Sequence, residues 1–150
     1  MKKIILLVDD DCDDAEFFKW ALVGTEDTFT VKFVDSGHDA LQLLSNLDPL
    51  PDLILLDAGM PKMNGWDLLR LIKQDQRLGN IPVIMIATSS RKEGIDDAHS
   101  LGAEAYIVKP SDFDELKLIM NQLCAGVQED LRNSLQNMSS NLPERIYTFS

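Results

Sequence analysis

Cysteine is scarce in this chain, and its spacing excludes two classes of protein. The 150 residues include two cysteines, Cys12 and Cys124, with no CxxC pair and no spacing typical of a metal site. A small secreted domain held by disulfide bonds would carry several pairs, and a zinc site would need clustered ligands. We therefore predict that both thiols are reduced and structural, as is typical of a cytoplasmic protein.

Long apolar runs are also missing. No run approaches the roughly 20 apolar residues that a helix needs to cross a bilayer, so we expect no association with the membrane. The first residues, Lys2 and Lys3 followed by the apolar run 4–8, resemble the start of a signal peptide. The acids that begin at Asp9 interrupt this pattern too early for a secretory signal, which again predicts a cytoplasmic protein.

Positive charge is outnumbered. The chain has 14 Lys and Arg residues against 25 Asp and Glu residues, which gives a formal net charge of −11 at pH 7. Such a surface repels phosphate backbones, so we predict no binding to nucleic acid. Hydrophobic residues make up 45% of the chain, which favours one ordinary domain with a core over a disordered chain.

Apolar runs alternate with amphipathic stretches along most of the chain. Short continuous runs indicate strands buried on both faces, whereas the run that contains Lys32 alternates and predicts a strand at a sheet edge. Strand–helix units of this length force parallel pairing with helices on both faces, which is the α/β class. The predicted strands are residues 4–8, 30–37, 52–57, 83–87 and 105–110.

The C-terminal part does not fit this repeat. An apolar stripe at helical spacing continues past Gly126. It predicts one helix over residues 112–138, bent or broken near that glycine. We therefore divide the chain into a domain at 1–125 and a helical extension or tail at 126–150. The stripe would either dock on the domain or pair with a second copy to form a homodimer.

Charged residues stand at the ends of three predicted strands. Asp9 and Asp10 follow the first strand, Asp57 ends the third and Lys109 ends the fifth. Parallel α/β sheets bind ligands beyond the carboxyl ends of their strands, so we expect these side chains to converge. Clustered carboxylate oxygens favour Mg²⁺ over zinc, and a carboxylate can accept a phosphoryl group. Any one of these residues alone would be a loop acid or a surface lysine.

Four motifs in order resemble one family. Together they span about residues 3–125, and the resemblance is to the receiver domain of two-component response regulators. It implies a flavodoxin-like fold with a five-stranded parallel sheet in the order 2-1-3-4-5. It also implies Mg²⁺ and a phosphoryl group taken from a histidine kinase or phosphotransfer protein. The motifs are "LLVDDD", "LILLDAGMPKMNG", "IPVIMIATSS" and "AYIVKP".

The resemblance implies roles for the acids. Asp57 would be the phosphoacceptor, and it would bind the metal together with the other acids. Asp10 would be a direct metal ligand, Asp9 would act mainly through water, and the backbone carbonyl of Gly59 would complete the set.

The resemblance also implies roles on the last two strands. Lys109 would contact the phosphoryl group, and its bond to Pro110 would be cis. The family ends its fourth strand with Thr or Ser, but this chain has Ala87 there, followed by Thr88. Either the Thr88 side chain would contact the phosphoryl group in its place, or the backbone N–H of Thr88 would do so alone, or switching would be weakened. Tyr106 matches the aromatic partner of this switch, whose coupling to phosphate Ala87 puts in doubt.

Three functions follow from these motifs. The leading one is a phosphorylation switch that assists its own phosphorylation and dephosphorylation, is not a conventional enzyme, and signals in trans to an unidentified downstream protein. Ala87 supports a degenerate receiver that binds partners without phosphorylation. A Mg²⁺-dependent phosphohydrolase would need a second acid at Gly59. The neighbouring acids Asp11, Asp13 and Asp14 are interpreted as helix-capping, solvated residues.

Overall fold

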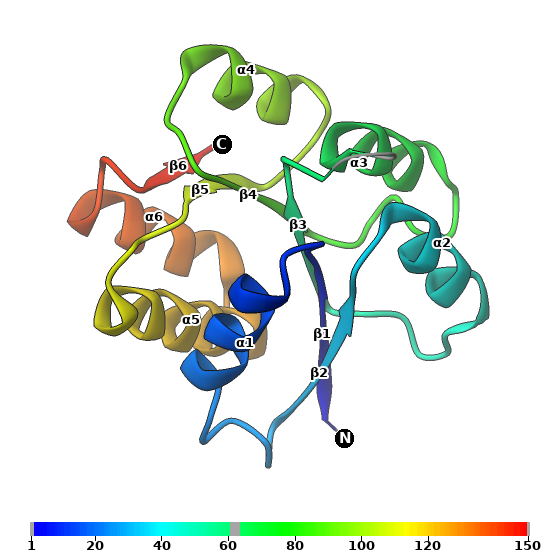
Figure 1. Ribbon diagram of the computed structural model, residues 1–150, viewed down its shortest axis with the longest axis horizontal. Coiled ribbons are helices and arrows are strands. Elements are labelled where there is room, and N and C mark those ends of the chain that lie inside the picture. Colours follow the sequence, from blue (N-terminus) through cyan, green and yellow to red (C-terminus); the bar gives the residue numbers. More distant parts are fainter. Residues whose placement is uncertain (1, 61–63, 150) are drawn as a thin grey trace.

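A computed structural model describes residues 2–60 and 64–149, whose strands form one sheet in the order β2-β1-β3-β4-β5-β6 (Figure 1). The first five strands are parallel in the predicted order, which confirms the flavodoxin-like α/β fold, with β2 at the edge as Lys32 indicated. Residues 61–63, in the loop predicted after Asp57, lie outside the described part. The elements are β1 (Lys3–Val8), α1 (Cys12–Ala21), β2 (Phe29–Val34), α2 (Gly37–Asn46), β3 (Leu53–Asp57), α3 (Gly65–Gln74), β4 (Val83–Ala87), α4 (Lys92–Ser100), β5 (Ala105–Val108), α5 (Phe113–Gln128), α6 (Leu131–Asn141) and β6 (Ile146–Thr148).

Helices cover both faces of the sheet (Figure 1). In β1, Ile5 and Leu7 join the apolar core under α1, α5 and α6, whereas Leu6 and Val8 join the core under α2, α3 and α4. This alternation explains why the central strands are continuous apolar runs, since both of their faces are buried. No helix in the described ranges combines the length and apolar character needed to cross a membrane.

The helix predicted over 112–138 is instead two helices, α5 and α6, separated by Glu129 and Asp130. Asp130 caps α6, because its side chain accepts a backbone N–H of the first turn. Gly126 lies inside α5, close to the break that was predicted near it. A Cβ there would lie 2.8 Å from Ser134 Oγ, so the missing side chain lets α6 pack closely against α5.

Residues 146–148 form a strand, β6, that was not predicted from the sequence. β6 pairs antiparallel with β5, and the N–H of Val108 donates to the Arg145 carbonyl at 2.8 Å. Arg145 also forms an ion pair with Glu115 at the start of α5, with 3.0 Å between Nε and Oε1. Ile146 is buried in the same apolar core as α5 and α6. The extension is therefore docked on the rest of the domain over its described residues, 126–149.

Candidate functional site

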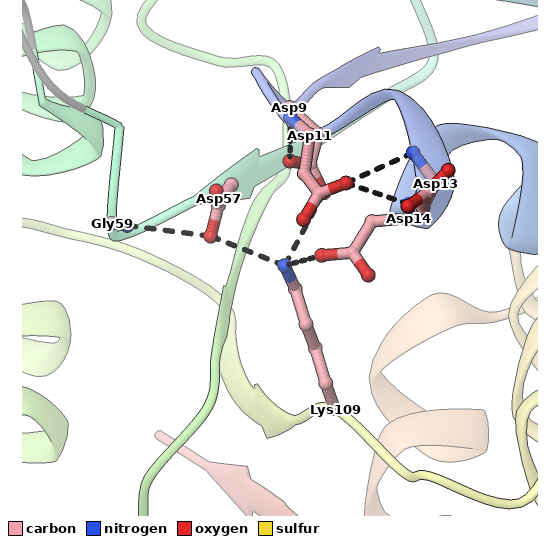
Figure 2. Close-up of polar contacts among 7 residues, drawn as sticks. All are labelled: Asp9, Asp11, Asp13, Asp14, Asp57, Gly59 and Lys109. Atoms are coloured by element: carbon pink, nitrogen blue, oxygen red, sulfur yellow. Dashed lines mark hydrogen bonds and ion pairs between the residues drawn. The ribbon is translucent and has the colours of Figure 1, made fainter.

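The carboxyl ends of β1, β3 and β5 bring the predicted charged residues together (Figure 2). β1 and β3 are neighbours in the sheet, which places Asp9 and Asp57 side by side. Lys109 follows β5 and reaches past the end of β4. Its Nζ lies 3.3 Å from Asp9 Oδ2 and 3.4 Å from Asp57 Oδ1. The convergence predicted from three strand ends is present in the fold.

Three of the acids form a cluster that fits a hard divalent cation. Asp9, Asp10 and Asp57 each offer a carboxylate oxygen, and these oxygens lie within 4.8 Å of one another. Asp9 is 4% and Asp57 7% exposed, whereas Asp10 is open to solvent. The backbone N–H of Gly59 donates to Asp57 Oδ1 at 3.3 Å, so this loop lies against the same carboxylate. An all-oxygen set of this kind suits Mg²⁺ or Mn²⁺.

Burial makes the cluster electrostatically unfavourable without such a cation. Burial is the main reason why the pKa of Asp9 is raised from 3.8 to about 6. The N–H of Asp11 and the charge of Lys109 act in the opposite direction, and the charge of Asp57 adds to the rise. Burial alone would lower the pKa of Lys109, but its contacts with the acids, led by that with Asp14, raise it. Lys109 therefore remains charged.

Asp14 belongs to this site, contrary to its interpretation as a solvated residue. Its Oδ2 lies 2.6 Å from Lys109 Nζ, the shortest of the ion pairs that the lysine forms. Asp11 caps α1 as predicted, since its Oδ1 accepts the N–H groups of Asp13 and Asp14. Helical spacing could have predicted this contact. Asp14 lies four residues after Asp10, about one helical turn, so its side chain lies on the side of α1 that is near the end of β1.

The end of β4 forms another wall of the site. Ala87 pairs with Val108, and its carbonyl accepts the N–H of Lys109 at 2.8 Å. Thr88 comes next and is exposed. Both residues line a cleft of about 520 Å³ together with Asp57 and Lys109. The fold thus places Thr88 on the cleft where the sequence predicted a phosphoryl contact, and Ala87 beside it.

Tyr106 is buried and points inward. Its hydroxyl donates to the Ser89 carbonyl at 2.6 Å, and its ring meets the ring of Tyr147 edge-on, with centroids 6.2 Å apart. Burial raises the pKa of this phenol. The residue predicted as a switch therefore connects the loop after β4 with the C-terminal strand β6.

The cis bond predicted between Lys109 and Pro110 is wrong. In the described chain the cis bond joins Asp48 and Pro49. A bond before proline favours the trans form by about 0.5–1 kcal/mol. Lys109 reaches Asp57 from the trans form, so aiming this lysine does not require the rarer isomer.

Proteins of known structure share this fold. The family model of the response regulator receiver domain matches residues 5–121. The two-component response regulator ORR5 of Oryza sativa subsp. japonica is 35% identical over 123 residues, covering 82% of this chain and 87% of that protein. The phosphorylated cyanobacterial phytochrome response regulator RcpA has a TM-score of 0.79 at 30% identity, covering 86% of this chain and 96% of that chain. The Mn²⁺-bound form of response regulator Rcp1 has a TM-score of 0.72 at 28% identity, covering 81% of this chain and 91% of that chain.

The chain belongs to the response regulator receiver domain family. The resemblance drawn from four motifs is thereby confirmed, and the protein is placed in two-component signalling. Domains of this family are phosphorylated by histidine kinases or phosphotransfer proteins and act on downstream targets, and they are generally not catalytic. The bound Mn²⁺ in Rcp1 and the acidic cluster of this chain are consistent with divalent metal binding.

Proposed function

We propose that this protein is a phosphorylation switch in the cytoplasm, with Asp57 as its phosphoacceptor. A histidine kinase or phosphotransfer protein supplies the phosphoryl group, and the response is passed in trans to a downstream protein. One observation carries the proposal: the Asp57 carboxylate borders the cleft within 3.4 Å of the Lys109 ammonium and beside two further acids. The Asp57 nucleophile, the Lys109 ammonium and the acids that can bind a metal then lie together in one site.

The chemistry follows from these neighbours. An Asp57 oxygen attacks phosphorus, the bond from phosphorus to the donor breaks, and the donor leaves with the electron pair, which gives an acyl phosphate. The N–H of Gly59 orients the carboxylate through Oδ1, and Lys109 supplies positive charge next to it. Mg²⁺ bound by Asp9, Asp10, Asp57 and the Gly59 carbonyl would neutralise the charge of the transferring group.

The switch runs through the loop after β4. Thr88 lines the cleft, and the next carbonyl along, that of Ser89, holds the Tyr106 hydroxyl. A phosphoryl group that draws the Thr88 hydroxyl or N–H inward would move the Ser89 carbonyl and change the environment of Tyr106. Ala87 has no hydroxyl for this purpose, so the task falls to Thr88.

The test is intact mass after incubation with acetyl phosphate, with and without Mg²⁺. We expect a single Mg²⁺-dependent adduct of one phosphoryl group, with acetate as the leaving group. Asp57→Asn removes the nucleophile while keeping the size of the side chain, so the adduct should be lost. An adduct that persists in Asp57→Asn would show that another residue accepts the phosphoryl group.

The same experiment separates the two other functions. A degenerate receiver, which the missing hydroxyl at Ala87 favours, would remain unlabelled while folded. A phosphohydrolase would release phosphate many times per protein molecule. We expect neither result, because the acids and Lys109 are in contact and Gly59 supplies no second acid.

Mg²⁺ should also stabilise the folded protein. A ligand that binds the folded state at about 100 times its Kd adds about 2.7 kcal/mol to the free energy of unfolding. The measurement is urea denaturation with Mg²⁺ or with EDTA. Asp10→Asn removes an exposed acid of the cluster, so its gain from Mg²⁺ should be much smaller. An equal gain in both proteins would place the cation elsewhere.

A further inference from the structure

Lys109 is held by three carboxylates at once, and its shortest contact is not with an acid at a strand end. Its Nζ lies 2.6 Å from Asp14 Oδ2, compared with 3.3 Å to Asp9 Oδ2 and 3.4 Å to Asp57 Oδ1 (Figure 2). An ammonium group has three N–H donors. Its hydrogen bonds go to Asp14 and Asp9, its contact with Asp57 is an ion pair, and its side chain is only 14% exposed.

The contact with Asp57 is the longest of the three, so the ammonium has to move away from one of its other two partners to hydrogen-bond a phosphoryl group there. Asp57 itself carries the phosphoryl group. The Asp9 side chain is 1% exposed, so water cannot take the place of the lysine at this carboxylate. The Asp14 side chain is 35% exposed, so water can solvate it once Lys109 leaves. The contact with Asp14 is therefore the one that yields.

We propose that Asp14 is a positioning residue that holds the Lys109 ammonium toward α1 until a phosphoryl group on Asp57 takes its place. Asp14 then opposes phosphorylation, because capture of the phosphoryl group includes breaking the shortest of the Lys109 contacts. The exchange also releases the Asp14 carboxylate in the first turn of α1. Phosphorylation of Asp57 therefore changes the contacts at the start of that helix. This inference rests on the proposed function of Asp57.

The test compares two variants that remove the same charge one residue apart. Asp14→Asn should label with acetyl phosphate and Mg²⁺ about three- to fivefold faster than the wild type, the upper part of the range for a partly exposed ion pair. Asp13→Asn should stay within about twofold, because the Asp13 side chain is exposed and is not a partner of Lys109. Asp14→Glu restores the charge and should return the rate toward that of the wild type. Equal acceleration in both Asn variants, or slower labelling of Asp14→Asn, would overturn the proposal.

A second measurement needs neither metal nor phosphodonor. In urea denaturation, the shifts in midpoint caused by Asp14→Asn and Lys109→Met should not add in the double variant, whereas those of Asp13→Asn and Lys109→Met should add. If the shifts of Asp14→Asn and Lys109→Met add in the double variant, Asp14 does not hold Lys109, whatever the labelling rates show. If the wild type takes no label, the proposed function fails together with the claim that Asp14 opposes phosphorylation, and this cycle still decides whether Asp14 holds Lys109.

Discussion

Leu135→Ala in α6 will destabilise the whole domain by about 2–5 kcal/mol, the range measured for truncating a large buried side chain. Leu135 is 2% exposed and belongs to the same apolar core as α1, α5 and the central strands. The loss is comparable to the total stability of about 5–15 kcal/mol that a domain of this kind has. If the extension were a loose tail, truncating one of its side chains would have almost no effect.

Two probes of urea denaturation will test this prediction. Trp66 lies in α3 on the opposite face of the sheet, so in a Trp20→Phe background its fluorescence reports on the distant core. We expect its transition and the far-UV circular dichroism transition to shift together in Leu135→Ala. Asn137→Ala, at an exposed position of the same helix, should change stability by less than about 0.5 kcal/mol. A Trp66 transition that Leu135→Ala leaves unchanged would show that α6 unfolds separately.

Asp9→Asn will stabilise the metal-free protein at neutral pH. The pKa of Asp9 is raised from 3.8 to about 6, mainly by burial, so the folded state binds this proton more tightly than the unfolded state. The contribution of Asp9 to the free energy of unfolding is therefore most favourable below pH 4, and it falls as the pH rises from about 4 to about 6. A shift of roughly two units corresponds to about 3 kcal/mol above that window. Asparagine removes this penalty and can still accept the N–H of Asp11 through its Oδ1.

The measurement is urea denaturation in EDTA across this pH range. The attraction of Lys109 is already part of this raised pKa, so we expect a gain of at most about 3 kcal/mol at pH 7.5, fading toward pH 4. Asp96→Asn, an exposed acid in α4, should show neither the gain nor its pH dependence. A gain of equal size at pH 4 and pH 7.5 would exclude the buried charge as its cause.

The features that could be predicted from the sequence are those that a local pattern determines. Central strands are buried on both faces, so they require continuous apolar runs, and the charges at Asp9, Asp57 and Lys109 stand out at their ends. The fold class and the meeting of these side chains at one edge of the sheet follow from that pattern. The family resemblance added the sheet order, because apolar runs alone do not fix which strands are neighbours.

The features that were missed depend on segments far apart in the chain. Asp14 contacts a lysine 95 residues later, and α1 had to be placed before that contact could be seen. Gly126 was expected to bend a helix, but its role depends on α6 packing against it. β6 has only three residues, and it becomes a strand because β5 offers it an unpaired edge.

The short strand β6 also changes what the sheet offers to another protein. Its antiparallel pairing uses the outward backbone groups of β5, from Ala105 to Ile107. A partner therefore cannot extend the sheet at β5 by strand addition unless it first displaces β6. Recognition on this side depends on side-chain chemistry. At the opposite end, β2 pairs with β1 alone among the strands of residues 2–60 and 64–149, so its outer edge is the one where a partner strand could be added.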